Sequence, residues 1–223
     1  MRTLQDHSQV FRSARNTASK ALKVRGTDAI FLAGRLDVTI PPLGSSSSTF
    51  PLTRHGTVRS DFLRENFPKS IPVKPRKTLK FKAKGAIDFF NGTSAGYGPD
   101  GGAPQGTSLF GIAGISGYDG PTGGLVGVFL SDENPKDTFR PKSLNFTPTG
   151  LGTGFKKLSP ELGQVFFIGD GRRGTGVGNQ QKFVAPKGAT RLFFGIADGF
   201  GFVGKPGYYE DNDGFYKVSI TRL

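Results

Sequence analysis

The residue types that usually carry enzyme chemistry are scarce in this chain. Its 223 residues include two histidines, His7 and His55, and no cysteine. Covalent catalysis and metal hydrolysis usually require a nucleophile beside a base, or several ligands at a regular spacing. Neither histidine belongs to such a pattern. We therefore interpret the chain as a non-enzymatic protein that acts by binding.

Two other patterns that resemble sites lack the context that their chemistry needs. Closely spaced glycines in GRRGTGVGN (171–179) resemble a phosphate-binding loop, but the apolar segment 181–186 that follows reads as a strand. Phosphate loops of the dinucleotide and Walker types lead into a helix. We predict instead a hairpin loop that displays Arg172 and Arg173. The neighbouring carboxylates Asp132 and Glu133 lie in a polar stretch and carry no motif.

The elements that would position any site read as strands. In TLKFKAKG (78–85) the apolar residues Leu79, Phe81 and Ala83 alternate with lysines, which predicts one buried face and one lysine-covered face. Gly-rich turns separate the other candidate strands, with no convincing helix between them. We predict an all-β fold, an antiparallel β-sandwich of jelly-roll type. The other expected strands are 28–33, 123–131, 164–170, 181–186, 190–198 and 214–223.

The positive charge is concentrated in the first third of the chain. Residues 1–84 carry 17 Lys and Arg against 5 Asp and Glu, whereas residues 85–223 carry 13 against 12. We expect a basic N-terminal arm over 1–27, with a short amphipathic helix within it, and a sandwich over 28–223. A long basic loop should run from about 35 to 77.

Such an asymmetry predicts an acidic partner: a protein, a nucleic acid or an anionic membrane. A basic surface that serves only solubility is the alternative. The residues expected to contact the partner combine cations with one apolar anchor, and they are Phe11, Arg12, Arg15, Lys20, Lys23 and Arg25.

No stretch of the sequence has the apolar length of a membrane span. The first 16 residues also lack the apolar core of an export signal. We therefore expect a protein of the cytoplasm, or of a particle assembled there.

Five motifs in order make the chain similar to one bacterial family. The sequence resembles the PA-IL-like galactophilic lectins and their relatives over about residues 78–223. This resemblance implies a galactose-binding-domain-like sandwich. The motifs are GYGPDGG (96–102), GLVGVFL (124–130), LSPELGQVFFIGDG (158–171), FVAPKGATRLFFGIADG (183–199) and PGYYEDNDGFYKVSI (206–220).

In these lectins a Ca²⁺ ion lies between loops at one end of the sandwich and binds sugar hydroxyls directly. The resemblance implies side-chain ligands at Asp198, Asp211 and Asn212, and backbone carbonyls from Tyr208 and about Asn91. Hard oxygen donors of this kind suit calcium. The alternative is that Asp and Asn simply form turns here.

The resemblance also implies a sugar site in the loop after GYGPDGG, where Tyr97 and Gln105 would contact a ligand. Galactose-binding members use a His together with a Gln in this loop, and only the Gln has a counterpart. We therefore expect weak or no galactose binding.

Two functions are consistent with this sequence. The first is a structural or interaction protein, a lectin-type sandwich held in a larger assembly by its basic arm. Its partners would be acidic proteins of a supercomplex or virion, with nucleic acid as a less favoured partner. The alternative is a calcium-dependent carbohydrate-binding lectin, for which the ligand is a glycan.

Overall fold

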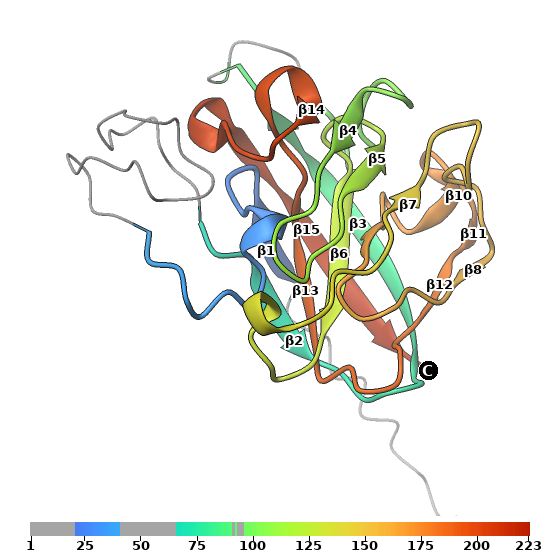
Figure 1. Cartoon of the computed structure of the whole chain (residues 1–223). Helices are drawn as coiled ribbons and strands as arrows, with labels where there is room; N and C mark the ends of the chain where they lie inside the picture. The colour runs from blue at the N-terminus through green and yellow to red at the C-terminus, as the bar shows by residue number, and fades with distance from the viewer. Residues whose placement is uncertain (1–20, 41–65, 91, 93–95) are drawn as a thin grey trace, which may run out of the picture.

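The structure, a computed structural model, describes residues 21–40, 66–90, 92 and 96–223 (Figure 1). The predicted helix of the arm, most of the arm and part of the basic loop lie outside these residues.

The described chain is an all-β sandwich, as predicted (Figure 1). One sheet has the strand order β1-β15-β3-β12-β8 and the sheet facing it has the order β2-β13-β6-β9. A third sheet has the order β14-β4-β5-β7, and β10 and β11 form a hairpin. The strands are β1 (Leu22–Arg25), β2 (Lys69–Pro72), β3 (Thr78–Asp88), β4 (Thr107–Leu109), β5 (Tyr118–Gly120), β6 (Leu125–Leu130), β7 (Leu144–Asn145), β8 (Lys157–Leu158), β9 (Val165–Phe167), β10 (Arg172–Gly174), β11 (Val177–Gln180), β12 (Lys182–Val184), β13 (Arg191–Ile196), β14 (Val203–Gly204) and β15 (Asp213–Arg222).

Helical structure among the described residues is limited to single 3-10 turns. They are η1 (Ile30–Leu32), η2 (Pro135–Asp137), η3 (Phe200–Phe202) and η4 (Tyr209–Asp211).

Phenylalanine side chains join the two main sheets. The ring centroid of Phe81 on β3 lies 4.9 Å from that of Phe183 on β12 and 5.6 Å from that of Phe194 on β13 across the sandwich. Phe166 on β9 lies 5.6 Å from Phe183. Aromatic pairs at these separations add to the free energy gained by burying their apolar area. The core thereby fixes the two sheets, and with them the loops at either end.

The alternation predicted for 78–85 is confirmed. Leu79 and Phe81 are buried, whereas Lys82 and Lys84 are exposed. Strand β15 pairs with β3 along its whole length, in register from Asp213 opposite Asp88 to Arg222 opposite Leu79.

The expected strand at 28–33 is not a strand. Asp28 and Ala29 form only isolated bridges, and the next three residues form η1. All six residues of this run are buried, so it lacks the alternation of buried and exposed side chains that a strand with one solvent-facing side shows. It lies against β13 at Gly195, where an added Cβ atom would be 2.5 Å from the carbonyl oxygen of Asp28.

The expected boundary at residue 27 and the extended loop at 35–77 are also corrected. Strand β1 lies within the expected arm, yet it pairs with β15, and its Val24 is fully buried. Strand β2 pairs with β13. Strand β1 carries Lys23 and Arg25 at exposed positions and β2 carries the half-buried Lys69, so charge concealed the strand character of both segments in the sequence.

Candidate functional site

The residues predicted to hold a metal begin with Asp198, which follows β13 at one end of the sandwich. Its Oδ1 accepts a hydrogen bond from the backbone N–H of Gly199 at 2.7 Å, and its Oδ2 accepts one from Asn212 Nδ2 at 2.8 Å. Both side chains are buried. Asp198 and Asn212 therefore converge, although 13 residues separate them in the chain.

Tyr209 also contacts the end of β13 next to Asp198. Its buried hydroxyl donates to the carbonyl of Ile196 at 2.8 Å and accepts from the N–H of Asp198 at 3.2 Å. Two side chains therefore connect the loop 209–212 to the end of β13: the Tyr209 hydroxyl and the Asn212 amide.

The amide of Asn212 has a defined orientation. Nδ2 donates to the Gly26 carbonyl at 3.0 Å as well as to Asp198. A cation shared by Asp198 and Asn212 would need the amide oxygen on the side of Asp198. The oxygen donors match those that calcium prefers, but joint ligation would require the Asn212 amide to rotate and to give up the bond to Gly26.

The other predicted ligands are less closely grouped. Asp211 ends η4 and its side chain is half-buried. Tyr208 precedes η4 in a left-handed backbone conformation, φ 66° and ψ 36°, and its ring lies 5.1 Å from that of Phe200. Asn91 lies outside the described residues. In the part of the chain that is described, no three His, Asp or Glu side chains form a group that could hold a metal ion.

Two buried carboxylates at this end were not anticipated. Asp28 Oδ2 accepts from the Arg25 N–H at 2.9 Å, and burial raises the pKa of Asp28. Asp88 Oδ1 accepts from the N–H groups of Phe90 and Gly92 at 2.6 and 2.9 Å. Each shapes a turn, which is the ordinary use of Asp outside strands. In the sequence, the only indication that these two carboxylates are buried is that each lies directly beside an apolar run.

The two residues predicted to contact a sugar, Tyr97 and Gln105, have different surroundings. Tyr97 is half-buried, with its ring 5.6 Å from that of Phe89. An added Cβ at Gly102 would lie 2.2 Å from the Tyr97 ring, so the ring packs on that glycine. Gln105 is exposed in the following loop. Tyr97 therefore serves packing in this structure, and only Gln105 presents its side chain to solvent.

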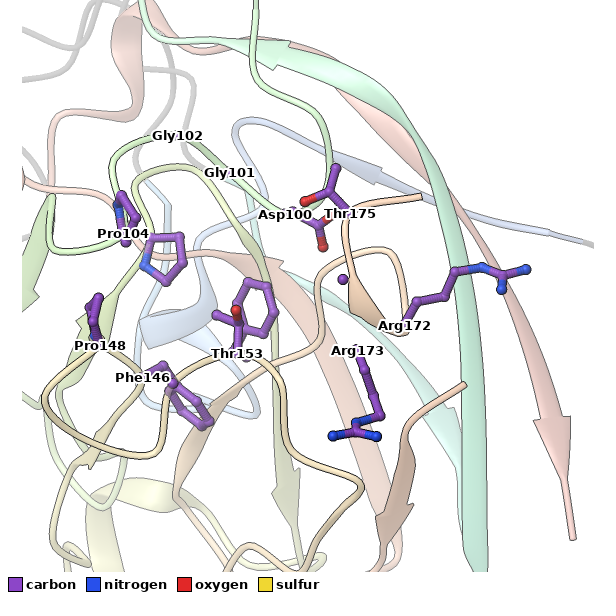
Figure 2. A pocket seen from close by; sticks show the side chains of 14 residues that line it. Asp100, Gly101, Gly102, Pro104, Phe146, Pro148, Thr153, Arg172, Arg173 and Thr175 are labelled. Atoms are coloured by element: carbon purple, nitrogen blue, oxygen red, sulfur yellow. The ribbon is translucent and has the colours of Figure 1, made fainter. Parts of the chain in front are cut away.

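A pocket of about 390 Å³ opens beside the same loop (Figure 2). Its volume falls within the range of small-molecule sites. Rigid apolar groups form much of its wall, and Asp100, Thr153 and Thr175 add polar groups. The apolar lining residues are Pro104, Pro121, Phe146, Pro148 and Phe167.

Asp100 is the one carboxylate that lines this pocket. Its Oδ1 accepts from the Asp170 N–H at 2.8 Å, and the Thr175 hydroxyl also hydrogen-bonds to it. Burial raises the pKa of Asp100. The protein itself already uses this carboxylate to hold the β10–β11 hairpin, so its evident role is to position the hairpin.

The segment predicted as a hairpin loop forms a hairpin of two short strands, β10 and β11, and Arg172 and Arg173 lie on β10 rather than in the loop. The guanidinium of Arg172 donates to the Gly178 carbonyl at 2.8 Å, and Nε of Arg173 donates to the Gly154 carbonyl at 3.0 Å. In Figure 2 the Arg172 side chain extends away from the pocket.

Of the predicted partner-binding residues, Lys23 and Arg25 are described, and both are exposed on β1. Lys23 Nζ lies 4.0 Å from the ring centroid of Phe215 on β15, a cation–π contact. The remaining four, Phe11, Arg12, Arg15 and Lys20, lie outside the described residues.

Comparison with known proteins found no match, either to a protein-family model or to a curated protein. The likeness to the PA-IL-like lectins therefore stays a prediction from the motifs. Among the described residues, no helix has the length and apolarity to cross a membrane.

Proposed function

We propose that the chain is a non-enzymatic interaction protein, a sandwich held in a larger assembly by a basic N-terminal arm that contacts acidic protein partners. The observation that carries this proposal is the setting of Lys23 and Arg25. Both side chains are exposed on an edge strand of the sandwich, at the point where the arm joins it.

The surroundings of these cations support a role outside the chain. On the neighbouring strand β15, Lys217 stands directly opposite Lys23, and Phe215 stands opposite Arg25. Neither of these two neighbours offers a carboxylate, and the carboxylate of Asp28, which interacts electrostatically with both cations, is buried. In the sequence, four further cations precede this strand within residues 1–20. Many weak contacts acting together would hold the partner, because a single exposed ion pair contributes about 0–1 kcal/mol.

Removal of residues 1–20 tests this proposal. The full chain and the truncated chain are each expressed untagged in the native host, and the material that elutes with them is compared. We expect the full chain to elute within a complex and the truncated chain to elute alone with an unchanged melting temperature. Raised salt should also release the full chain, because exposed charges are screened. A truncated chain that stays in the complex would refute the role of the arm.

Calcium-dependent carbohydrate binding is the second candidate, and the convergence of Asp198 and Asn212 favours it. Calcium bound only to the folded chain would raise the melting temperature by mass action. An Asn212→Ala variant is the matched control, because it should lose that increase. No increase at about 1–10 mM Ca²⁺, above the range of weak extracellular sites, would reject this candidate. A glycan array with strong calcium-dependent galactoside signals would favour it over the assembly function.

A further inference from the structure

The outward face of the five-stranded sheet is a second basic surface, which adjoins the arm at Lys23 and Arg25 of β1. Lysines recur at every second residue of β3, so they share one face at a spacing of about 6.7 Å. Neighbouring strands add cations that point the same way. The lysine face is defined as Lys80, Lys82 and Lys84 of β3, Lys217 of β15, Lys23 and Arg25 of β1, Lys182 of β12 and Lys157 of β8.

The strand register places several of these charges directly opposite one another. Lys23 stands opposite Lys217, and Lys217 stands opposite Lys84, so three ammonium groups form a row across β1, β15 and β3. Lys182 likewise stands opposite Lys157. Like charges directly opposite in a sheet destabilise it. An anionic surface over this face would remove that repulsion.

No carboxylate on these strands offsets the row. Outward positions of β15 beside the lysines hold Phe215, Ser219 and Thr221, and the outward residue of β3 beyond Lys84 is Ala86. Among the described strands of this sheet, acidic side chains occur only at the far end of the β3–β15 ladder, where Asp88 stands opposite Asp213.

We propose that the lysine face docks on the surface of a bilayer that contains anionic lipids. This goes beyond the proposed function, because it uses the preformed sheet rather than the arm and takes lipid headgroups rather than an acidic protein. Side chains on one face of a sheet end at similar heights, so many of these lysines can reach a planar surface together. Clusters of four to eight basic residues suffice for such electrostatic attachment.

The residue types favour lipid over the other acidic partners. Protein interfaces are enriched in Arg and large aromatic residues and depleted of Lys, whereas seven of the eight cations here are lysines. Proteins that bind single-stranded nucleic acid stack bases on several aromatic side chains. Phe215 is the only aromatic residue among the outward positions of the described strands of this sheet, and Lys23 lies over its ring.

Sedimentation of the full chain with vesicles tests the proposal. Phosphatidylcholine vesicles are compared with vesicles that also contain about 30% phosphatidylserine, at low salt and at about 0.5 M NaCl. We expect binding only to the anionic vesicles at low salt. The K80Q/K82Q/K84Q variant should lower the partition coefficient about 100-fold, from the contribution of each lysine near a charged surface.

Two further variants test whether binding depends on the positive charge and on its position on the lysine face. The K80R/K82R/K84R variant should restore binding, because it keeps the charges. The K136Q/K187Q/K205Q variant loses as many exposed lysines elsewhere and should bind nearly as the unchanged chain does. All variants should melt normally. Equal binding by the two glutamine variants would overturn the proposal, as would failure of the full chain to bind anionic vesicles. Preference for polyglutamate or single-stranded DNA over anionic vesicles in competition would also overturn it.

Discussion

Val24 provides a direct test of where the sandwich begins. It is fully buried on β1, between the exposed side chains of Lys23 and Arg25, and it stands opposite Tyr216 of β15. Val24→Ala removes two methyl groups, each worth about 0.8 kcal/mol when buried. The cavity adds to that loss, so we expect a cost of about 2 kcal/mol.

Removal of the whole strand should cost more. A chain that lacks residues 1–27 loses Val24, the β1–β15 pairing and the Gly26 carbonyl that accepts from Asn212. Burial of a Val and satisfaction of a buried polar group together suggest about 5 kcal/mol. That approaches the lower limit of the total stability of a typical domain, about 5–15 kcal/mol.

Thermal unfolding of four chains would measure these effects. For a chain of this size, 1 kcal/mol corresponds to a shift of about 2–4 °C. Val24→Ala should therefore melt about 4–8 °C lower, whereas Lys23→Ala should melt within about 1–2 °C of the unchanged chain. Removal of residues 1–20 should have little effect, and removal of 1–27 should lower the melting temperature by about 10–20 °C or prevent folding. Equal melting of the two truncated chains would refute the assignment of β1 to the core.

Three other changes follow from the described contacts. Asn212→Ala removes the donor to both Asp198 and Gly26 and should cost about 2–3 kcal/mol in urea unfolding; a cost near zero would mean that this buried corner is not a stabilising link. Phe81→Ala should cost about 3–5 kcal/mol, because the ring joins both sheets, whereas Lys82→Ala next to it should cost little. Burial raises the folded-state pKa of Asp28 above 3.8, so the folded chain binds the proton more tightly and stability falls as pH rises through that raised pKa. Asp28→Asn should therefore be more stable than the unchanged chain at pH 7 and lose this advantage below about pH 3.8; an advantage that is the same at both pH values would contradict the linkage.

Alternation and turn spacing predicted the long strands of the fold. Strands β3, β6, β13 and β15 were found near their predicted ranges because each has at least three apolar side chains that are buried or half-buried on its inward face. Strands β10 and β11 contain two glycines, Gly174 and Gly178, and no buried side chain. They form because a turn and the Asp170 carboxylate hold them, with Oδ1 accepting from the Arg172 N–H and Oδ2 from the Gly176 N–H. A hydrophobic pattern cannot report a strand of this kind.

The site was only partly predictable for a similar reason. Asp198 and Asn212 were expected to converge because the resemblance to the PA-IL-like lectins implies that both are calcium ligands. The partner of Asn212 at Gly26 could not be found in this way, since a backbone carbonyl has no sequence signal and lies 186 residues away in the chain. The pocket beside Asp100 likewise depends on prolines from separate loops. Only the packing of these loops brings them together.

The strand ladder of β3 and β15 separates charge along one rigid axis. From Lys80 to Asp88 the distance along β3 is about 27 Å, with ammonium groups over one stretch and carboxylates at the other end. This part of the molecule is therefore an electric dipole that does not depend on side-chain rearrangement. Near a negatively charged plane it experiences a torque before any contact forms, and the lysine end of the ladder turns toward the plane. The encounter rate, as well as the final affinity, should then depend on ionic strength.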